Sequence, residues 1–174
     1  MGDTAMTVVV IFLAAIVMFV PSLMTTADKN DDITSLSVQT ATTEFTNKIR
    51  TTGALTQADY DNFILTLAST GNSYDVEITV QKLDENPAKK TSSGVTTIGD
   101  NVYYTMYTTQ ILDEIGASAD STLKLNEGDI VSVSVKNTNT TIGQQLRNAM
   151  YKVTGNSASA VTAEESGIVT TTKN

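Results

Sequence analysis

Carboxylates are the main side chains through which this chain could bind metals or catalyse reactions, because it contains no His and no Cys. The stretch Asp28–Asp32, with the sequence DKNDD, has the D-x-N-x-D opening of a calcium-binding loop. Such a loop requires Gly at its sixth position and Glu at its twelfth, where this chain has Ile33 and Gln39. We therefore expect no metal site here, and interpret the stretch as a solvated acidic collar beyond an apolar segment.

Two pairs of neighbouring acids, Asp84–Glu85 and Asp113–Glu114, are the remaining candidates for acid–base catalysis. Consecutive acids on loops and helix ends are usually solvated. The thiol nucleophile and the usual histidine base are both missing from the sequence. We therefore expect no enzymatic activity, no cofactor and no bound metal.

An aromatic cluster and one triplet are the candidates for binding or modification. The cluster YYTMY at 103–107 could form a surface on which sugars stack, or it could belong to the core or to a contact between subunits. We favour the second interpretation, because on a helix Tyr103, Met106 and Tyr107 would share one face. Asn139, followed by two Thr residues, matches the N-x-T acceptor pattern and is the candidate glycan site.

The composition describes a small acidic protein that is rich in threonine. The chain has 174 residues, a formal net charge of −8 and a pI of about 4.4. We expect one small domain with an appendage. We expect no binding to nucleic acid or to anionic lipid surfaces, both of which select basic patches. The 30 Thr residues are typical of a β-rich domain with solvated Thr, and also of bacterial surface proteins.

The appendage is the uncharged run Thr4–Ala27, which could be a cleaved signal, a membrane anchor or an assembly segment. A cleaved signal is disfavoured, because no Lys or Arg precedes the run and because the run is longer than the usual apolar part of a signal. The unbroken apolar stretch Val8–Val20, extended on both sides, is long enough to span a membrane.

The helix is expected to continue beyond the apolar run, through an amphipathic stretch at 28–50. Apolar residues recur there mostly every three or four positions, at Ile33, Leu36, Ala41, Phe45 and Ile49. We expect a kink at Pro21 and an end near Arg50, before a Thr-Thr-Gly breaker. Such a helix would be about 70 Å long.

A helix that is apolar on every side must be surrounded by lipid or by protein. A head of roughly 120 residues has no room to enclose it, so the helix must lie in a bilayer or among the helices of other copies. We expect the following side chains to hold such an assembly together: Val8, Ile11, Phe12, Ile16, Phe19 and Leu23, with the bend at Pro21.

Residues 53–174 are expected to form an α+β head, with helices on an antiparallel or mixed sheet. Thr56 should cap a helix with Asp59 at the capping-box position and Gly71 after its end. Its apolar face would contain Tyr60, Phe63, Ile64 and Leu67. Alternation predicts strands at 74–80 and 128–137.

The other parts of the head are less clearly patterned. The stretch 102–115 has strand propensity at its start, but its spacing favours a helix that Gly116 ends. A further helix should start after Thr140 or Thr141 and end at Gly155. The stretch 84–99 is expected to be an exposed loop, and one or two short strands are expected around 160–162 and 167–171.

The apolar helix near the N-terminus, its amphipathic continuation, the bend at Pro21 and the α/β head together resemble the plan of type IV pilins and related Tad-type pilins. In that family a peptidase removes a short basic leader, and the helix first rests in the membrane. The helix is then packed into the core of a helical filament. The family's acidic residue a few positions into the helix pairs with a neighbour's amino terminus. Here Asp3 is the candidate for that role, since position 5 is Ala.

The resemblance implies a structural subunit of an extracellular filament on the cell surface. It implies as partners further copies of the chain, the inner or cytoplasmic membrane before assembly, and a pilus-type assembly machinery. The alternative is a single-span, membrane-anchored accessory protein of a secretion or conjugation apparatus with an external acidic domain. A further alternative is an enzyme or a sugar-binding head on a stalk.

Overall fold

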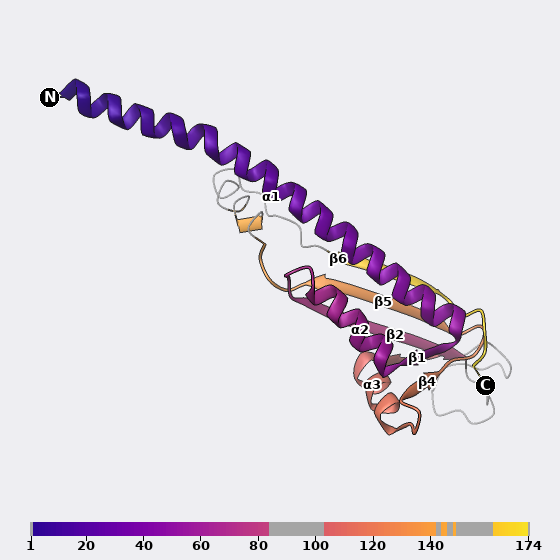
Figure 1. The fold of residues 1–174 in the computed structure, drawn as a ribbon. Helices are drawn as coiled ribbons and strands as arrows, with labels where there is room; N and C mark the ends of the chain where they lie inside the picture. The colour runs from indigo at the N-terminus through magenta and orange to yellow at the C-terminus, as the bar shows by residue number, and fades with distance from the viewer. Residues whose placement is uncertain (1, 84–102, 142–143, 146–147, 149–161, 174) are drawn as a thin grey trace, which may run out of the picture.

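The computed structural model describes residues 2–83, 103–141, 144–145, 148 and 162–173. One long helix, α1 (Gly2–Thr52), dominates the molecule and is followed by a small head (Figure 1). The first half of α1 projects away from the head, while its second half lies along strands β5 (Ile130–Asn137) and β6 (Thr162–Ile168). The architecture is pilin-like in this sense, and the predicted α+β class with a long N-terminal helix is confirmed.

Helix α1 runs through Pro21 as one continuous element. Proline has no N–H to donate to the preceding turn, but the surrounding residues keep the helical backbone. Gly53 follows the last helical residue with a positive φ of 62°, and a Cβ at this position would collide with the Thr171 carbonyl oxygen. Glycine is therefore required where the chain leaves α1 and enters the head.

The head contains a four-stranded antiparallel sheet in the order β3-β2-β5-β6, in which β3 is Tyr103–Tyr107. Its central pair is β2 (Tyr74–Leu83) and β5, in which Val80 lies opposite Val131 and Ile78 opposite Val133. These alternating apolar residues are all buried, as the period of two predicts. A small second sheet joins β1 (Ala54–Thr56) to β4 (Thr122–Lys124), next to the end of α1.

Helix α2 (Gln57–Ala68) begins as the sequence predicts. The Thr56 side chain accepts a hydrogen bond of 3.1 Å from the backbone N–H of Asp59, which satisfies one of the free donors of the first turn. Phe63 and Leu67 are buried, while Tyr60 and Ile64 are half-buried. Gly71 lies in the turn after this helix, with a φ of 80°.

The helix predicted over 102–115 is wrong in its first part. Tyr103–Tyr107 forms strand β3, paired with the end of β2, and only Thr108–Ala117 forms a helix, α3. Val80 lies opposite Met106, so pairing with β2 prevails over a spacing that also suited a helix. Gly116 is inside α3 rather than after it.

The side of α1 that faces the head also differs from the prediction. Ile33 and Leu36 are exposed, whereas Thr34 and Val38 are buried against the head. Ala41, Phe45 and Ile49 do contact the core, as expected. The predicted apolar face was displaced in its first two turns, because spacings of three and four were compatible with more than one side of the helix.

The end of the chain forms one strand, β6, where the sequence predicted one or two short strands. Residues 170 and 171, where the sequence predicted the end of a strand, are not in a strand. The loop predicted at 84–99 lies outside the described residues, as does most of the helix predicted after Thr141. Gln144, Gln145 and Asn148 of that stretch are helical.

The hydrophobic core lies between the sheet, the second half of α1, and helices α2 and α3. Its largest fully buried side chains are Ile49, Leu55, Ile78, Ile111, Ile115, Leu123 and Leu125. None of the core residues comes from α1 before Thr34. The head therefore completes its core with only the second half of the long helix.

Candidate assembly surface

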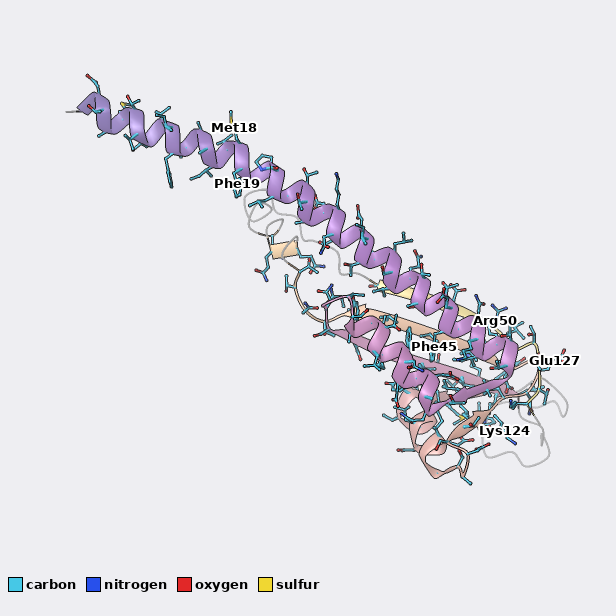
Figure 2. All side chains as sticks on the ribbon, viewed as in Figure 1. Met18, Phe19, Phe45, Arg50, Lys124 and Glu127 are labelled. Carbon is cyan, nitrogen blue, oxygen red and sulfur yellow. The ribbon has the colours of Figure 1, made fainter. Side chains whose placement is uncertain are left out.

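The first half of α1 carries an apolar surface that the head does not cover. Among the described residues this helix is the one that is long and apolar enough to cross a membrane, and none of its most apolar window is buried. Met18 and Phe19 lie on the stretch beyond the sheet (Figure 2), and they are 80% and 64% exposed. The segment is thus compatible with a place in a membrane.

The structure places every residue predicted for assembly on this uncovered stretch. Their exposed fractions run from 43% at Ile16 to 68% at Phe12, and the set comprises Val8, Ile11, Phe12, Ile16, Phe19 and Leu23. Asp3 and Pro21 are exposed as well. These predicted residues share one side of the helix, since they recur mostly every three or four positions. Further apolar side chains are exposed on the other sides, at Val9, Val10, Val17 and Met18, so a single partner on one side could not cover the whole segment.

Three threonine hydroxyl groups on this stretch are bound to the helix itself. Thr7 donates to the Asp3 carbonyl oxygen at 2.8 Å, and Thr25 donates to the Pro21 carbonyl oxygen at 3.0 Å. Thr26 donates in the same way to Ser22. Because these donors already have partners, the segment can leave water without losing a hydrogen bond from them.

A polar region, here called the neck, joins α1 to the head through Asp31, Thr141 and Gln144. The hydroxyl of Thr141 donates to Asp31 Oδ2 at 3.0 Å and accepts from the backbone N–H of Gln144 at 3.1 Å. The backbone N–H of Thr141 in turn donates to Gln144 Oε1, which completes a capping box. Asp31 was predicted to be part of a solvated collar, and the structure instead gives it a role in attaching the head to α1.

The neck also contains an amide pair around the candidate glycan site. Asn139 Oδ1 accepts from the Ser73 N–H at 2.9 Å, and Asn139 Nδ2 donates to Asn72 Oδ1 at 3.1 Å. Asn139 remains exposed at the surface. Next to it a groove of about 610 Å³ runs between α1 and the turns of the head, lined by Leu23, Ala27, Asn30, Asp31 and Gly71, among others.

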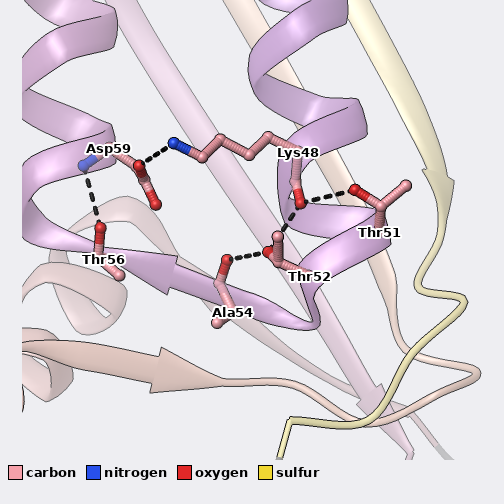
Figure 3. Close-up of polar contacts among 6 residues, drawn as sticks. All are labelled: Lys48, Thr51, Thr52, Ala54, Thr56 and Asp59. Atoms are coloured by element: carbon pink, nitrogen blue, oxygen red, sulfur yellow. Dashed lines mark hydrogen bonds and ion pairs between the residues drawn. The ribbon is translucent and has the colours of Figure 1, made fainter.

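The base of α1 is fixed to the head by charged and polar contacts (Figure 3). Lys48 binds Asp59 on α2 at 2.5 Å, and the backbone N–H of Asp59 donates to the Thr56 hydroxyl. Partial burial raises the pKa of Asp59, but the hydrogen bonds from Lys48 and Thr56 and the charge of Lys48 outweigh this effect and lower it. Burial, aided by the charge of Asp61, raises the pKa of the neighbouring Tyr60.

Arg50 forms the second contact at the base of α1. Its Nε donates to the Ile168 carbonyl oxygen at 3.0 Å, and its guanidinium also donates to Asn47. The side chain crosses directly over Gly167 on β6, where any Cβ would collide with the Arg50 side chain. The sequence alone contained no signal for this contact, because its partners are more than a hundred residues apart.

The remaining candidates for chemistry do not come together in the described parts of the chain. Asp113 and Glu114 are exposed on α3, and Glu114 forms a 3.5 Å ion pair with Lys82. Asp84 and Glu85 lie outside the described residues. The acidic collar is part of a continuous helix rather than a loop, and among the described residues no group of three potential ligands could hold a metal ion.

The aromatic cluster is split between the two faces of β3. Met106 is buried, while Tyr103, Tyr104 and Tyr107 are 38%, 51% and 53% exposed. Alternation along a strand places Tyr103 and Tyr107 opposite to Met106, so the prediction that the three share one face is wrong. The tyrosines belong to the surface and contribute little to the core.

Comparison of the chain with protein-family models, with curated proteins and with solved structures finds no significant match.

Proposed function

We propose that this protein is a structural subunit of an extracellular helical filament, which polymerises through the apolar segment Thr4–Ala27. The observation that supports this proposal most directly is the exposure of apolar side chains all around the first half of α1, which takes no part in the core of the head. Burying one such side chain contributes about 1.5–3 kcal/mol. Several of them per copy are enough to hold an assembly together.

In the proposed mechanism, the helices of many copies pack side by side and form the apolar core of the filament. The heads form its outer surface, and Asp3 pairs with the amino terminus of a neighbouring copy. Each copy uses one surface to contact a different surface of the next, and such contacts produce a helix when they do not close into a ring. The role is structural and requires no catalysis or cofactor.

The apolar segment has two successive environments in this proposal. It first lies in the inner or cytoplasmic membrane, for which its length is sufficient. A pilus-type assembly machinery then transfers it from lipid to the helices of sister copies. The finished filament stands on the cell surface, and neither stage involves nucleic acid.

A second function is supported by the same length of apolar helix. The segment could remain in the bilayer permanently and anchor the acidic head of an accessory protein of a secretion or conjugation apparatus. Shearing of cells followed by carbonate extraction of membranes separates the two. A filament subunit is released by shearing in polymeric form, whereas a permanent anchor stays with the extracted membranes. Retention of all the protein in the membranes would contradict the filament proposal.

A further inference from the structure

Two large aliphatic residues are exposed on the second half of α1, next to threonines that are buried. Ile33 and Leu36 are 65% and 64% exposed, whereas Thr34, between them in sequence, is only 8% exposed. The exposed pair lies one turn apart on the side of α1 that points away from the head. Neither side chain belongs to the core of the head, although Ile33 borders a shallow groove between α1 and the end of α2.

This placement is the reverse of what folding of a single copy favours. The side of α1 that packs on the head also buries Thr42 and Thr46, and the Thr46 hydroxyl has no hydrogen-bond partner among the described residues. Exchanging aliphatic and hydroxyl side chains between the two sides would bury more apolar area in one copy. The aliphatic pair is thus available for a contact outside the single copy.

The side of α1 that carries this pair leads back to the apolar segment through four polar positions. Moving back from Leu36 in steps of three and four gives Ile33, Lys29, Thr25 or Thr26, Ser22 and Met18. Thr25 and Thr26 have their hydroxyls bound to the helix backbone, at 3.0 and 3.1 Å. A partner helix that covers Met18 could therefore extend to Ile33 and Leu36 without stripping those hydroxyls of partners.

We infer that Ile33 and Leu36 form a second contact between copies, which receives the α1 helix of another copy of this chain. The inference rests on the proposed function, because the occupant is the same helix that would fill the core of the filament. Its apolar segment offers the complementary surface, since it is exposed on all sides. The contact would set how far one copy is shifted along the next, which the uniform apolar segment alone does not define.

The test uses photo-crosslinking in the purified full chain under assembly conditions. A benzophenone-bearing amino acid replaces Leu36 in one variant, Met18 in a second and Leu65 in a third. Leu65 is the matched control, because it is 66% exposed but lies on α2. We expect adducts of two copies at positions 18 and 36, with the crosslinked peptide mapping to α1, and few or none at position 65.

The other outcomes separate this inference from the proposed function. Adducts at position 18 without adducts at position 36 overturn the inference and leave the filament proposal standing. Equal adducts at positions 36 and 65 also overturn it, because they indicate random collision. Absence of adducts at position 18 contradicts the proposed function, and the inference with it.

One double substitution, with a single substitution as its control, measures the strength of the contact. Ile33→Ser with Leu36→Ser should raise the protein concentration needed for assembly about tenfold or more, while thermal unfolding of the head is unchanged. The control Leu65→Ser should change neither quantity. An unchanged assembly concentration in the double variant would overturn the inference.

Discussion

The rings of Phe45 on α1 and Phe63 on α2 stack in parallel, with centroids 4.2 Å apart and planes 2° apart. Both side chains are buried, and the contact links the long helix to the first helix of the head. The second half of α1 is therefore part of the head's core. The first half, which carries the apolar segment, is not.

We expect this stacked pair to be energetically coupled. Phe45→Leu and Phe63→Leu should each destabilise the head by about 1–2 kcal/mol. In the double variant the loss should be smaller than the sum by about 0.5–1.5 kcal/mol, because the stacking contact can be lost only once. Urea unfolding of the four proteins completes the cycle. Losses that add to within about 0.3 kcal/mol would show that the rings fill space without a specific mutual interaction.

A substitution at Gly167 should act through Arg50. The Cβ introduced by Gly167→Ala meets the Arg50 side chain and displaces its hydrogen bond to the Ile168 carbonyl oxygen. We expect a loss of about 1–2 kcal/mol in the free energy of unfolding. Gly116→Ala is the matched control, because no atom lies near its Cβ and helix α3 should gain about 0.5–1 kcal/mol.

The cause of the Gly167 effect can be isolated in the Arg50→Ala background. Once the guanidinium is gone, the added methyl group has space. Adding Gly167→Ala to Arg50→Ala should then lower the free energy of unfolding only slightly further. If Gly167→Ala lowers the free energy of unfolding as much in that background as in the native protein, the methyl group must clash with the strand itself and not with Arg50.

The Lys48–Asp59 contact should make the stability of the head depend on acid pH. The pKa of Asp59 is lowered from its ordinary value of 3.8, so the unfolded chain binds a proton more readily than the native protein does. The stabilisation is fully present above pH 3.8 and is lost as the pH falls through the lowered pKa. Asp59→Asn should therefore destabilise the head at neutral pH, and the difference from the native protein should shrink in strong acid.

Lys48→Met provides the check on that interpretation, because it removes the main hydrogen-bond donor and the nearby positive charge. This variant should lose much of the same pH dependence in urea unfolding. A native-like acid dependence in both variants would assign the effect to other carboxylates.

The neck should depend on Asp31 but not on its neighbour in the acidic collar. Asp31→Ala leaves the hydroxyl of Thr141, a residue that is 8% exposed, without its acceptor, and should lower the free energy of unfolding by about 1–2 kcal/mol. Asp32→Ala removes an exposed carboxylate and should remain within about 0.5 kcal/mol of the native protein. Amide hydrogen exchange near Thr141 should rise only in the first variant. Equal effects would show that the collar acts through its total charge.

Local patterns in the sequence predicted those elements whose determinants are close along the chain. Thr56 and Asp59 lie within one helical turn, so the start of α2 could be read from the sequence. The buried valines of β5 alternate strictly, so that strand could be read as well. Leu23 and the other apolar residues of the first half of α1 were correctly expected to lie on one long helix.

The features that sequence patterns missed depend on partners far along the chain. Strand β3 forms because β2 is available beside Met106, although the residues themselves suited a helix. Thr34 faces the head and Ile33 does not, since the orientation of α1 is set by contacts such as Thr43 with Glu165 and Arg50 with Ile168. Periodicity within α1 could not reveal contacts with residues that come more than a hundred positions later.

The central claim, that copies of this chain assemble through the apolar segment of α1, is tested most directly by electron microscopy of the purified full chain after detergent removal. The account predicts helical filaments, and their loss in a variant with Ile11→Asn and Phe12→Asn. Both replaced side chains are exposed and distant from the core, so the head of that variant should unfold at the same temperature as the native protein. Discrete particles under every condition, or filaments that persist in the variant, would contradict it.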